Sequence, residues 1–318
     1  MKYKSLKILA RQNWLKRIIR EKIVRLFVNP DLCPNYNFEE NIYGVKYKGN
    51  IRTYLDWNIF FFGAYEKQEL ELLYSIAQQR TNPVFIDIGA NTGEYSIVLS
   101  LLCKQVVSFE PFDKIREKLI SEIELNKLKN VDVQPVALGC KNEELKFFAP
   151  SETSCNAGTG SLLAQHEAET NKPYGVVQVR NASEHLENLK LPSIDIIKID
   201  VEGFEKSVLE GLQFVMKKYK PVIMMEFSVT SRSEFGTQSG FEALTEGYTP
   251  YRIRTDESAL FFFNSRKAKL VPFNFDVCPC NILLIPININ NWVKSFTARR
   301  VNQLTPKNSL IFLTANID

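Results

Sequence analysis

The stretch Val84 to Ser96, VFIDIGANTGEYS, decides the fold. Its first five residues are apolar apart from Asp87 and are typical of a buried strand. Gly89 and Gly93 follow, with Asn91 between them, and glycine and asparagine adopt left-handed backbone angles more readily than other residues. The residues after the turn have the pattern of a helix. A strand, a glycine-containing turn and a helix in this order open a nucleotide-binding βαβ unit.

The side chains around this turn exclude two common ligands. The dinucleotide motif G-x-G-x-x-G needs glycine where the sequence has Asn91 and Glu94. A P-loop is excluded because no Gly-Lys-Ser/Thr follows. Asp87 and Glu94 would also repel a pyrophosphate, which binds at positive helix N-termini. They suit a ligand with cationic groups and no phosphate, such as S-adenosylmethionine (SAM). If only Val84 to Ser96 is considered, the alternative to a SAM site is an ordinary strand–turn–helix that binds no ligand.

Composition and charge narrow the class of protein. The chain has 318 residues, 45% of them hydrophobic, which is enough for a large domain with an appendage. The formal net charge is +4, yet residues 1–28 hold nine basic residues and one acidic residue, so the remainder is mildly acidic. This distribution argues against a nucleic-acid-binding protein. No apolar run is long enough to span a bilayer, and the start does not resemble a secretory signal. The six cysteines have no zinc-site spacing, so we expect a cytoplasmic protein with reduced thiols.

The N-terminal region is predicted to be an extension, residues 1–65, that precedes the main domain at 66–318. Residues 1–28 have the pattern of one basic amphipathic helix, and the following residues are irregular, with short strands near 43–47 and 51–55. Two roles for the helix stay open. It binds an anionic membrane surface, which would make the protein peripheral at the inner membrane, or it packs its apolar face on the main domain.

From residue 84 onward, strands and helices alternate, which predicts an α/β fold with a mostly parallel sheet covered by helices on both faces. A polar loop at 151–174 is inserted within a β-pair at 144–148 and 176–180, and we expect it to form a lid over the site. Two later apolar runs, 259–263 and 281–285, are expected as antiparallel edge strands. The other predicted strands are 84–88, 106–110, 131–137, 194–200 and 222–227, and the predicted helices are 66–79, 95–102, 114–126 and 204–219.

Acidic residues end several of these strands and are expected to line one crevice, because ligands of such sheets bind beyond the carboxyl ends of the strands. Glu110 comes 21 residues after Gly89, the spacing of an acid that accepts hydrogen bonds from ribose hydroxyls. Asp200 and Glu226 end two further strands. Lys198, inside an apolar strand, is expected to pair with one of these acids.

The run FIDIGANTGEYS, followed by FEPF, IKIDVEGFE and MMEF, resembles the FkbM family of SAM-dependent methyltransferases. The resemblance implies the Rossmann-like class I methyltransferase fold, with a seven-stranded sheet. It also implies O-methyl transfer to a hydroxyl of a sugar, a glycan or a small natural product. The expected cofactor-binding residues are Asp87, Gly89, Ala90, Asn91, Gly93, Glu94, Tyr95, Glu110, Pro111, Phe112, Ala137 and Asp200.

For the chemistry, Asp200 is the first candidate for the group that accepts the hydroxyl proton, followed by Glu202 and His166. A site without metal is the main expectation. The alternative is a magnesium ion held by Asp200 and Glu226, as in catechol-type methyltransferases. Two other functions compete with methyl transfer. One is an NAD-dependent oxidoreductase on the same kind of sheet, which the missing glycines disfavour. The other is a membrane- or partner-binding module without activity.

Overall fold

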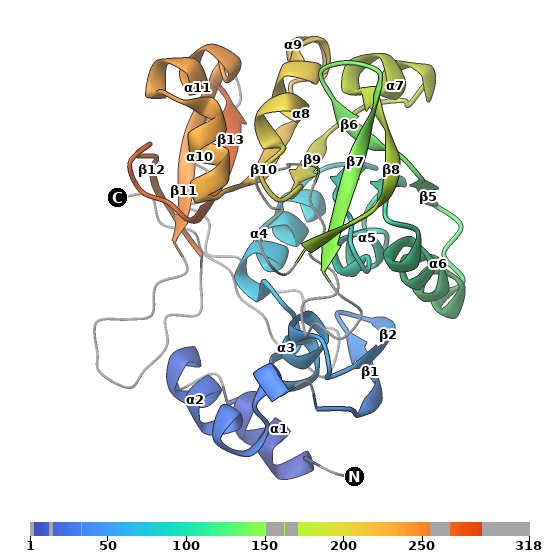
Figure 1. Ribbon diagram of the computed structural model, residues 1–318, viewed down its shortest axis with the longest axis vertical. Coiled ribbons are helices and arrows are strands. Elements are labelled where there is room, and N and C mark those ends of the chain that lie inside the picture. Colours follow the sequence, from blue (N-terminus) through green and yellow to red (C-terminus); the bar gives the residue numbers. More distant parts are fainter. Residues whose placement is uncertain are drawn as a thin grey trace.

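The computed structural model shows an α/β domain with a smaller N-terminal unit beneath it (Figure 1). The described residues are 3–12, 15–32, 34–150, 162, 171–254 and 268–287.

The core of the α/β domain is a sheet of eight strands in the order β12-β11-β13-β10-β9-β3-β4-β5. The five strands from β10 to β5 are parallel, while β13 runs antiparallel between β10 and β11. This is the class I methyltransferase fold, with β12 as one edge strand more than the predicted seven. The strand bounds are β3 Val84–Ile88, β4 Gln105–Phe109, β5 Val131–Gln134, β9 Ile196–Ile199, β10 Val222–Phe227, β11 Tyr248–Arg254, β12 Lys269–Pro272 and β13 Cys280–Pro286.

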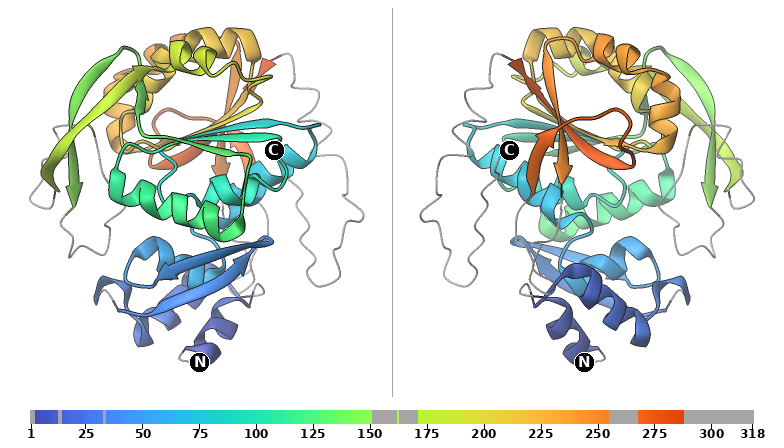
Figure 2. Two further views of the ribbon diagram at one scale, coloured as in Figure 1. Left: turned by 90° about the vertical axis from the view of Figure 1, so that its right-hand side faces the viewer. Right: turned by 90° about the vertical axis from the view of Figure 1, so that its left-hand side faces the viewer.

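Helices cover both faces of this sheet, as the two side views show (Figure 2). Successive residues of β3 point to opposite faces, so Phe85 belongs to one hydrophobic core and Ile86 to the other. Burial on both faces explains why the central parallel strands are mostly apolar. The helices are α4 Lys67–Gln78, α5 Glu94–Leu99, α6 Asp113–Asn126, α7 Ala182–Asn188, α8 Glu205–Gly211, α9 Gln213–Tyr219, α10 Val229–Phe235 and α11 Gln238–Leu244.

A second sheet has the strand order β6-β8-β7. Its strands are β6 Ala137–Gly139, β7 Glu143–Pro150 and β8 Asn171–Asn181. The predicted β-pair is therefore confirmed, and both strands are longer than expected. The predicted strand 131–137 is wrong as a single element, because the chain leaves the main sheet after Gln134 and β6 pairs with β8 instead. Most of the predicted lid lies outside the described residues.

The N-terminal unit contains a hairpin and three α-helices, and it differs most from the prediction. The single helix 1–28 is wrong, because the structure has two helices with a break between them. The predicted strand 43–47 is confirmed only from Val45 onward, because Tyr43 and Gly44 form the hairpin turn with φ of +51° and +99°. The predicted strand 51–55 is wrong, since an α-helix begins at Tyr54. The elements are α1 Lys4–Ala10, α2 Arg17–Phe27, a 3-10 helix η1 Pro30–Leu32, β1 Asn37–Ile42, β2 Val45–Asn50 and α3 Tyr54–Phe62.

Helix α3 was not predicted, because it is apolar on nearly all sides and has no helical periodicity to detect. Trp57 and Phe61 in it are fully buried. Its start is marked by Thr53, whose side chain accepts a hydrogen bond from the Asp56 backbone N–H at 3.1 Å. Helix α3 packs against α1, η1 and β2 and so forms the centre of the N-terminal unit.

The remaining differences lie near the end of the described chain. The predicted helix 204–219 is divided at Leu212 into α8 and α9. The predicted strand 281–285 is confirmed as β13, but it lies inside the sheet and not at its edge. Strand β11 was missed, and the predicted strand 259–263 falls outside the described residues. In the described part of the chain, no helix combines the length and apolarity that crossing a membrane requires.

Candidate active site

The glycine turn lies between β3 and α5 and is held against the ends of the two neighbouring strands. The backbone N–H groups of Gly89 and Ala90 both donate to the carbonyl of Phe109, at 3.0 Å each, which ties the turn to β4. Gly89 has a φ of +81°, and a Cβ built on it would lie 1.9 Å from the carbonyl oxygen of Asp200, beyond β9. Any side chain would push these strand ends apart, so the position requires glycine.

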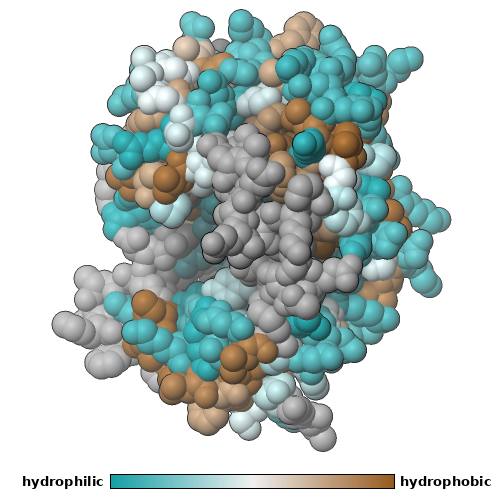
Figure 3. Space-filling model, viewed as in Figure 1, coloured by the Kyte–Doolittle hydropathy of each residue, from teal (hydrophilic) through white to brown (hydrophobic). Residues whose placement is uncertain are grey.

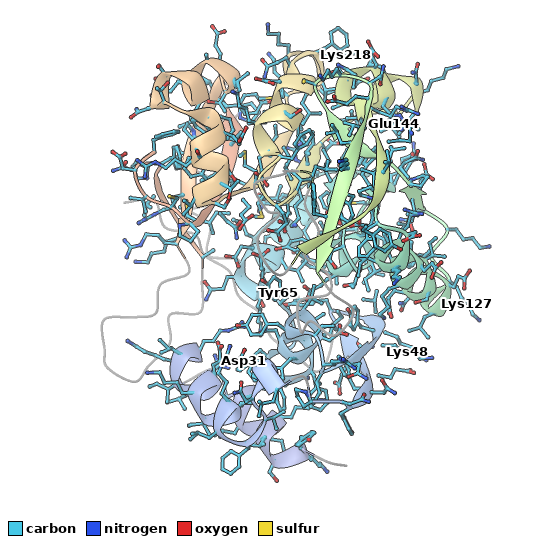
Figure 4. All side chains as sticks on the ribbon, viewed as in Figure 1. Asp31, Lys48, Tyr65, Lys127, Glu144 and Lys218 are labelled. Atoms are coloured by element: carbon cyan, nitrogen blue, oxygen red, sulfur yellow. The ribbon has the colours of Figure 1, made fainter. Side chains whose placement is uncertain are left out.

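A cavity of about 380 Å³ lies at this turn and at the carboxyl ends of β4, β9 and β10. Its volume is in the range of small-molecule sites. On the side of the N-terminal unit its wall includes Tyr65, which lies at the junction with the α/β domain (Figure 4). The predicted cofactor-binding residues in the cavity wall are Gly89, Ala90, Asn91, Glu94, Tyr95, Glu110, Pro111, Phe112, Ala137 and Asp200.

Two predicted cofactor-binding residues, Asp87 and Gly93, are not in this wall. Asp87 is 1% exposed and lies beneath the turn, where Oδ2 accepts a hydrogen bond from the Ser96 hydroxyl at 2.6 Å. Its Oδ1 has no hydrogen-bond partner among the described residues. Gly93 faces helix α6, and a Cβ there would lie 2.1 Å from Cδ1 of Leu119. Both residues shape the turn from behind, and their contact with a cofactor stays a prediction.

Glu110 lies at the end of β4 with its carboxylate oriented by the backbone. Oε2 accepts from the N–H of Asn91 and Oε1 from the N–H of Phe112, both at 2.9 Å. The guanidinium of Arg116 donates to the carbonyls of Glu110 and Pro111, at 2.9 and 2.8 Å, and fixes this segment. Burial raises the pKa of Glu110 to about 7. Each oxygen keeps accepting capacity toward the cavity.

Lys198 and Asp200 form a partly buried ion pair at the end of β9, with side chains that are 7% and 31% exposed. The ammonium of Lys198 donates to Oδ2 of Asp200 at 2.7 Å and lies 4.7 Å from the ring centroid of Tyr95. Burial would lower the pKa of Lys198, but the carboxylates of Asp200 and Asp87 outweigh this effect and hold it above its ordinary value. The predicted pairing of Lys198 with an acid is confirmed.

Three further carboxyl groups in the wall have raised pKa values. Burial is the main cause in each, with repulsion from neighbouring acids added. The pKa is raised to about 8 for Glu94, to about 7 for Glu202 and to about 9 for Glu226. At neutral pH Glu226 therefore holds its proton in this cavity. Such a carboxyl group donates one hydrogen bond and accepts others.

Glu66 and Tyr65 belong to the cavity wall but were not predicted as site residues. Glu66 accepts hydrogen bonds from the Tyr95 hydroxyl at 3.0 Å and from the side-chain amide of Asn281 at 3.1 Å. Burial, with repulsion from Asp200, raises the pKa of Glu66. An acid next to the start of a predicted helix is ordinary, so the sequence contains no signal for this role.

Two of the predicted catalytic residues, Asp200 and Glu202, lie in the cavity wall. His166 is outside the described residues, so its role stays a prediction. The magnesium alternative is not supported, because no group of three or more His, Cys, Asp or Glu side chains in the described ranges is arranged to hold a metal ion. Asp200 pairs with Lys198 instead, and Glu226 is surrounded by other acids.

Solved structures of similar fold include methyltransferases of low sequence identity. Methyltransferase FkbM from Methylobacillus flagellatus KT is 15% identical, covering 84% of this chain and 60% of that one, with a TM-score of 0.42. A SAM-dependent methyltransferase from Agrobacterium tumefaciens is 10% identical, covering 80% and 71%, with a TM-score of 0.44. SMU.1697c of Streptococcus mutans, solved in complex with SAH, is 10% identical, covering 69% and 97%, with a TM-score of 0.40.

No curated protein matches the sequence significantly. The family model described as the methyltransferase FkbM domain matches residues 87–253, more than half of the 318 residues. The matched range begins in β3, just before the glycine turn, and ends in β11, so it includes the strand ends that carry Glu110, Asp200 and Glu226. The chain therefore belongs to the FkbM methyltransferase family.

Proposed function

We propose that the protein is a SAM-dependent O-methyltransferase that acts on a hydroxyl of a sugar, a glycan or a related small natural product. The observation that carries this proposal is one cavity that is lined by two sets of residues. The first set is the glycine turn with Glu110, and the second is Asp200 with neighbouring carboxyl groups of raised pKa.

The glycine turn and Glu110 fit the cofactor. Glu110 is oriented by two backbone N–H groups and keeps accepting capacity for ribose hydroxyls. The tight turn at Gly89 packs directly on the end of β9, because no side chain separates it from the Asp200 carbonyl, and this fixes the turn in the cavity wall. Surrounding carboxylates suit the sulfonium and ammonium of SAM. When bound, SAM supplies an electrophilic methyl group on a positively charged sulfur, which departs with the C–S electron pair.

Asp200 and the carboxyl groups around it fit an acceptor with several hydroxyl groups. Asp200 gives Oδ2 to Lys198, which leaves Oδ1 to accept the proton of the acceptor hydroxyl as its oxygen bonds to the methyl carbon. Glu226 is protonated at neutral pH and donates a hydrogen bond, while ionised neighbours accept them. Tyr65, at 36% exposure in the wall, offers a ring on which a sugar face can pack.

The alternatives lack comparable support. An NAD-dependent oxidoreductase would need the glycines of the dinucleotide motif, and this turn has Asn91 and Glu94 in their place. A module without activity would not need the ion pair of Lys198 and Asp200 inside the cavity. We also place the protein in the cytoplasm, since the described cysteines Cys103, Cys140, Cys278 and Cys280 are all free thiols, which suits a reducing compartment.

The test has two steps. Titration calorimetry with S-adenosylhomocysteine (SAH) should show saturable binding by the full chain, and absence of binding would reject the proposal. The protein is then incubated with SAM and a panel of sugars, glycan intermediates and hydroxylated natural products, and products are read by mass spectrometry. A mass increase of one methyl group on a hydroxyl is expected. It should fall at least ~10²-fold in Asp200→Asn, which removes the proton acceptor. SAH binding without methylation of any hydroxyl compound would keep the cofactor and reject the acceptor class.

A further inference from the structure

Helix α2 has an inner face that is fixed on the rest of the protein. Val24 is fully buried and Arg20 is 5% exposed on this face. Just beyond the helix, the carbonyl of Val28 accepts a hydrogen bond from the Trp57 indole N–H at 3.1 Å, which ties the helix end to α3. Arg25 also lies 5.5 Å from the ring centroid of Tyr54, a residue of the cavity wall. Helix α2 is therefore held rigidly beside the cavity.

The outer face of the same helix exposes large apolar side chains. The exposed fractions are 58% for Ile18, 82% for Leu26 and 70% for Phe27. Ile18, Lys22 and Leu26 are four residues apart and form one line along the helix. In η1, Leu32 adds a fourth side chain at 79% exposure. Figure 3 shows hydrophobic surface over this end of the molecule, with hydrophilic side chains between.

The charge around this apolar surface is positive. Residues 3–12 and 15–32 contain eight basic and two acidic residues. Some charges of both signs are already engaged. The guanidinium of Arg25 donates to Glu21 at 3.0 Å and to Asp31 at 3.1 Å, Lys7 and Arg11 pair with Glu40, and Arg20 is buried. Lys22 is exposed between Ile18 and Leu26. A partner of this surface must therefore bury the apolar side chains and also present negative charge close to them.

We propose that the outer face of α2 together with η1, defined by Ile18, Lys22, Leu26, Phe27 and Leu32, is a docking surface for an anionic lipid bilayer. A bilayer interface matches both features, because the apolar side chains enter its acyl boundary while lysine reaches the phosphates. Each nearby base strengthens the attraction to the negative leaflet. The helix would lie in the interface plane and would not cross it. This proposal is independent of which acceptor is methylated.

Sedimentation with vesicles tests the docking surface. The full chain is mixed with vesicles of phosphatidylcholine alone and with vesicles that also contain phosphatidylglycerol. We expect pelleting with the anionic vesicles, little with the neutral ones, and a loss of binding as salt shortens the Debye length from ~30 Å to ~3 Å. The double variant Leu26→Ser/Phe27→Ser should partition at least ~10-fold more weakly, because two side chains lose their apolar burial.

A matched control is available outside the N-terminal unit. Phe214 in α9 and Val229 in α10 are 54% and 65% exposed, so Phe214→Ser/Val229→Ser removes similar apolar surface away from α2. This control should bind vesicles as the wild type does. Lys22→Glu should weaken binding to anionic vesicles only. SAH affinity and the thermal midpoint should be unchanged in all three variants, which shows that they are folded.

Three outcomes would overturn the proposal. The first is no pelleting of the wild type, or equal pelleting with neutral and anionic vesicles. The second is unchanged pelleting of Leu26→Ser/Phe27→Ser. The third is a wild-type dimer in solution that becomes a monomer in this variant without any vesicle binding, since the surface would then join two copies of the chain.

Discussion

The ammonium of Lys198 lies 2.7 Å from Oδ2 of Asp200, two residues further along the chain at the end of β9. Lys198 is 6% exposed, and its other close neighbour in the cavity is the ring of Tyr95. The pair brings positive charge to a wall that otherwise holds several carboxyl groups. It therefore stabilises the strand end and fixes the carboxylate to which we assign the proton of the acceptor hydroxyl.

Removing Lys198 should be costly, because Asp200 would be left as an uncompensated charge in a largely buried site. Lys198→Met is expected to lower the free energy of unfolding by ~3–5 kcal/mol, measured by urea denaturation. The double variant Lys198→Met/Asp200→Asn should recover part of this loss, because it removes both charges. Lys218→Met, which breaks a surface pair with Glu187, serves as the control and should leave the midpoint almost unchanged. No recovery in the double variant would mean that the pair is not the source of the effect.

Glu110→Ala should weaken SAH binding by ~1–3 kcal/mol, because the ribose hydroxyls lose charge-assisted hydrogen bonds. Calorimetry measures the change. Glu117, an exposed acid on the adjacent helix α6, provides the control, and Glu117→Ala should bind SAH as the wild type does. Unchanged affinity in Glu110→Ala would place the ribose elsewhere in the cavity.

Comparing Gly89 with Gly247 separates two effects of adding a side chain at positive φ: backbone strain and steric clash. Their φ angles are +81° and +84°, but a Cβ on Gly247 meets nothing within 4 Å, whereas one on Gly89 meets the Asp200 carbonyl. Gly247→Ala should cost only the backbone strain of a left-handed alanine, ~1 kcal/mol. Gly89→Ala should cost more in thermal or urea denaturation and should also reduce SAH binding. Equal losses in the two variants would show that the turn relaxes away from β9.

The raised pKa values predict that the empty protein becomes less stable as pH rises. The pKa is raised, mainly by burial, to about 8 for Glu94 and about 9 for Glu226, whereas an unfolded glutamate titrates near ~4.3. The folded state therefore keeps protons that the unfolded chain has released. The contribution of these two groups to the stability of the folded state is complete below pH ~4 and is lost as pH rises toward ~9. The thermal midpoint should fall steadily between pH 6 and pH 9.

Glu226→Gln tests the largest of these contributions, because glutamine has the shape of the protonated acid and does not ionise. At pH 8 or above the variant should melt at least ~2 °C higher than the wild type, and its midpoint should depend less on pH. Glu246, an exposed acid, supplies the control: Glu246→Gln should keep the wild-type slope. A steeper slope in Glu226→Gln would contradict the assigned protonation.

The sequence could predict the half of the site that is built from strand ends. Glu110 and Asp200 follow buried parallel strands and Glu226 lies near the end of another, and the geometry of such sheets brings these ends together. The other half could not be predicted. Glu66 reaches the cavity only because α4 packs on the sheet and Asn281 of β13 holds its carboxylate.

The same limit applies to the fold. Periodicity located the amphipathic helix α4, but α3 is buried on almost every side and has no polar face to reveal it. Strand β13 was identified as an apolar run, yet its place between β10 and β11 depends on pairing that an isolated segment does not encode. Asp87 and Gly93 belong to a clear sequence motif, yet the structure places both of them outside the cavity wall.

The position of β13 governs when the protein can fold during synthesis. It pairs with β10 on one side and β11 on the other, and Asn281 contacts Glu66 across 215 residues of sequence. Until residue 286 has left the ribosome, β10 has an open edge and the carboxyl groups of the cavity lack part of their support. Such distant contacts slow folding and leave apolar strands exposed to other nascent chains. A ribosome-bound chain that stops at β11 should therefore depend on chaperones, whereas one that includes β13 should resist protease.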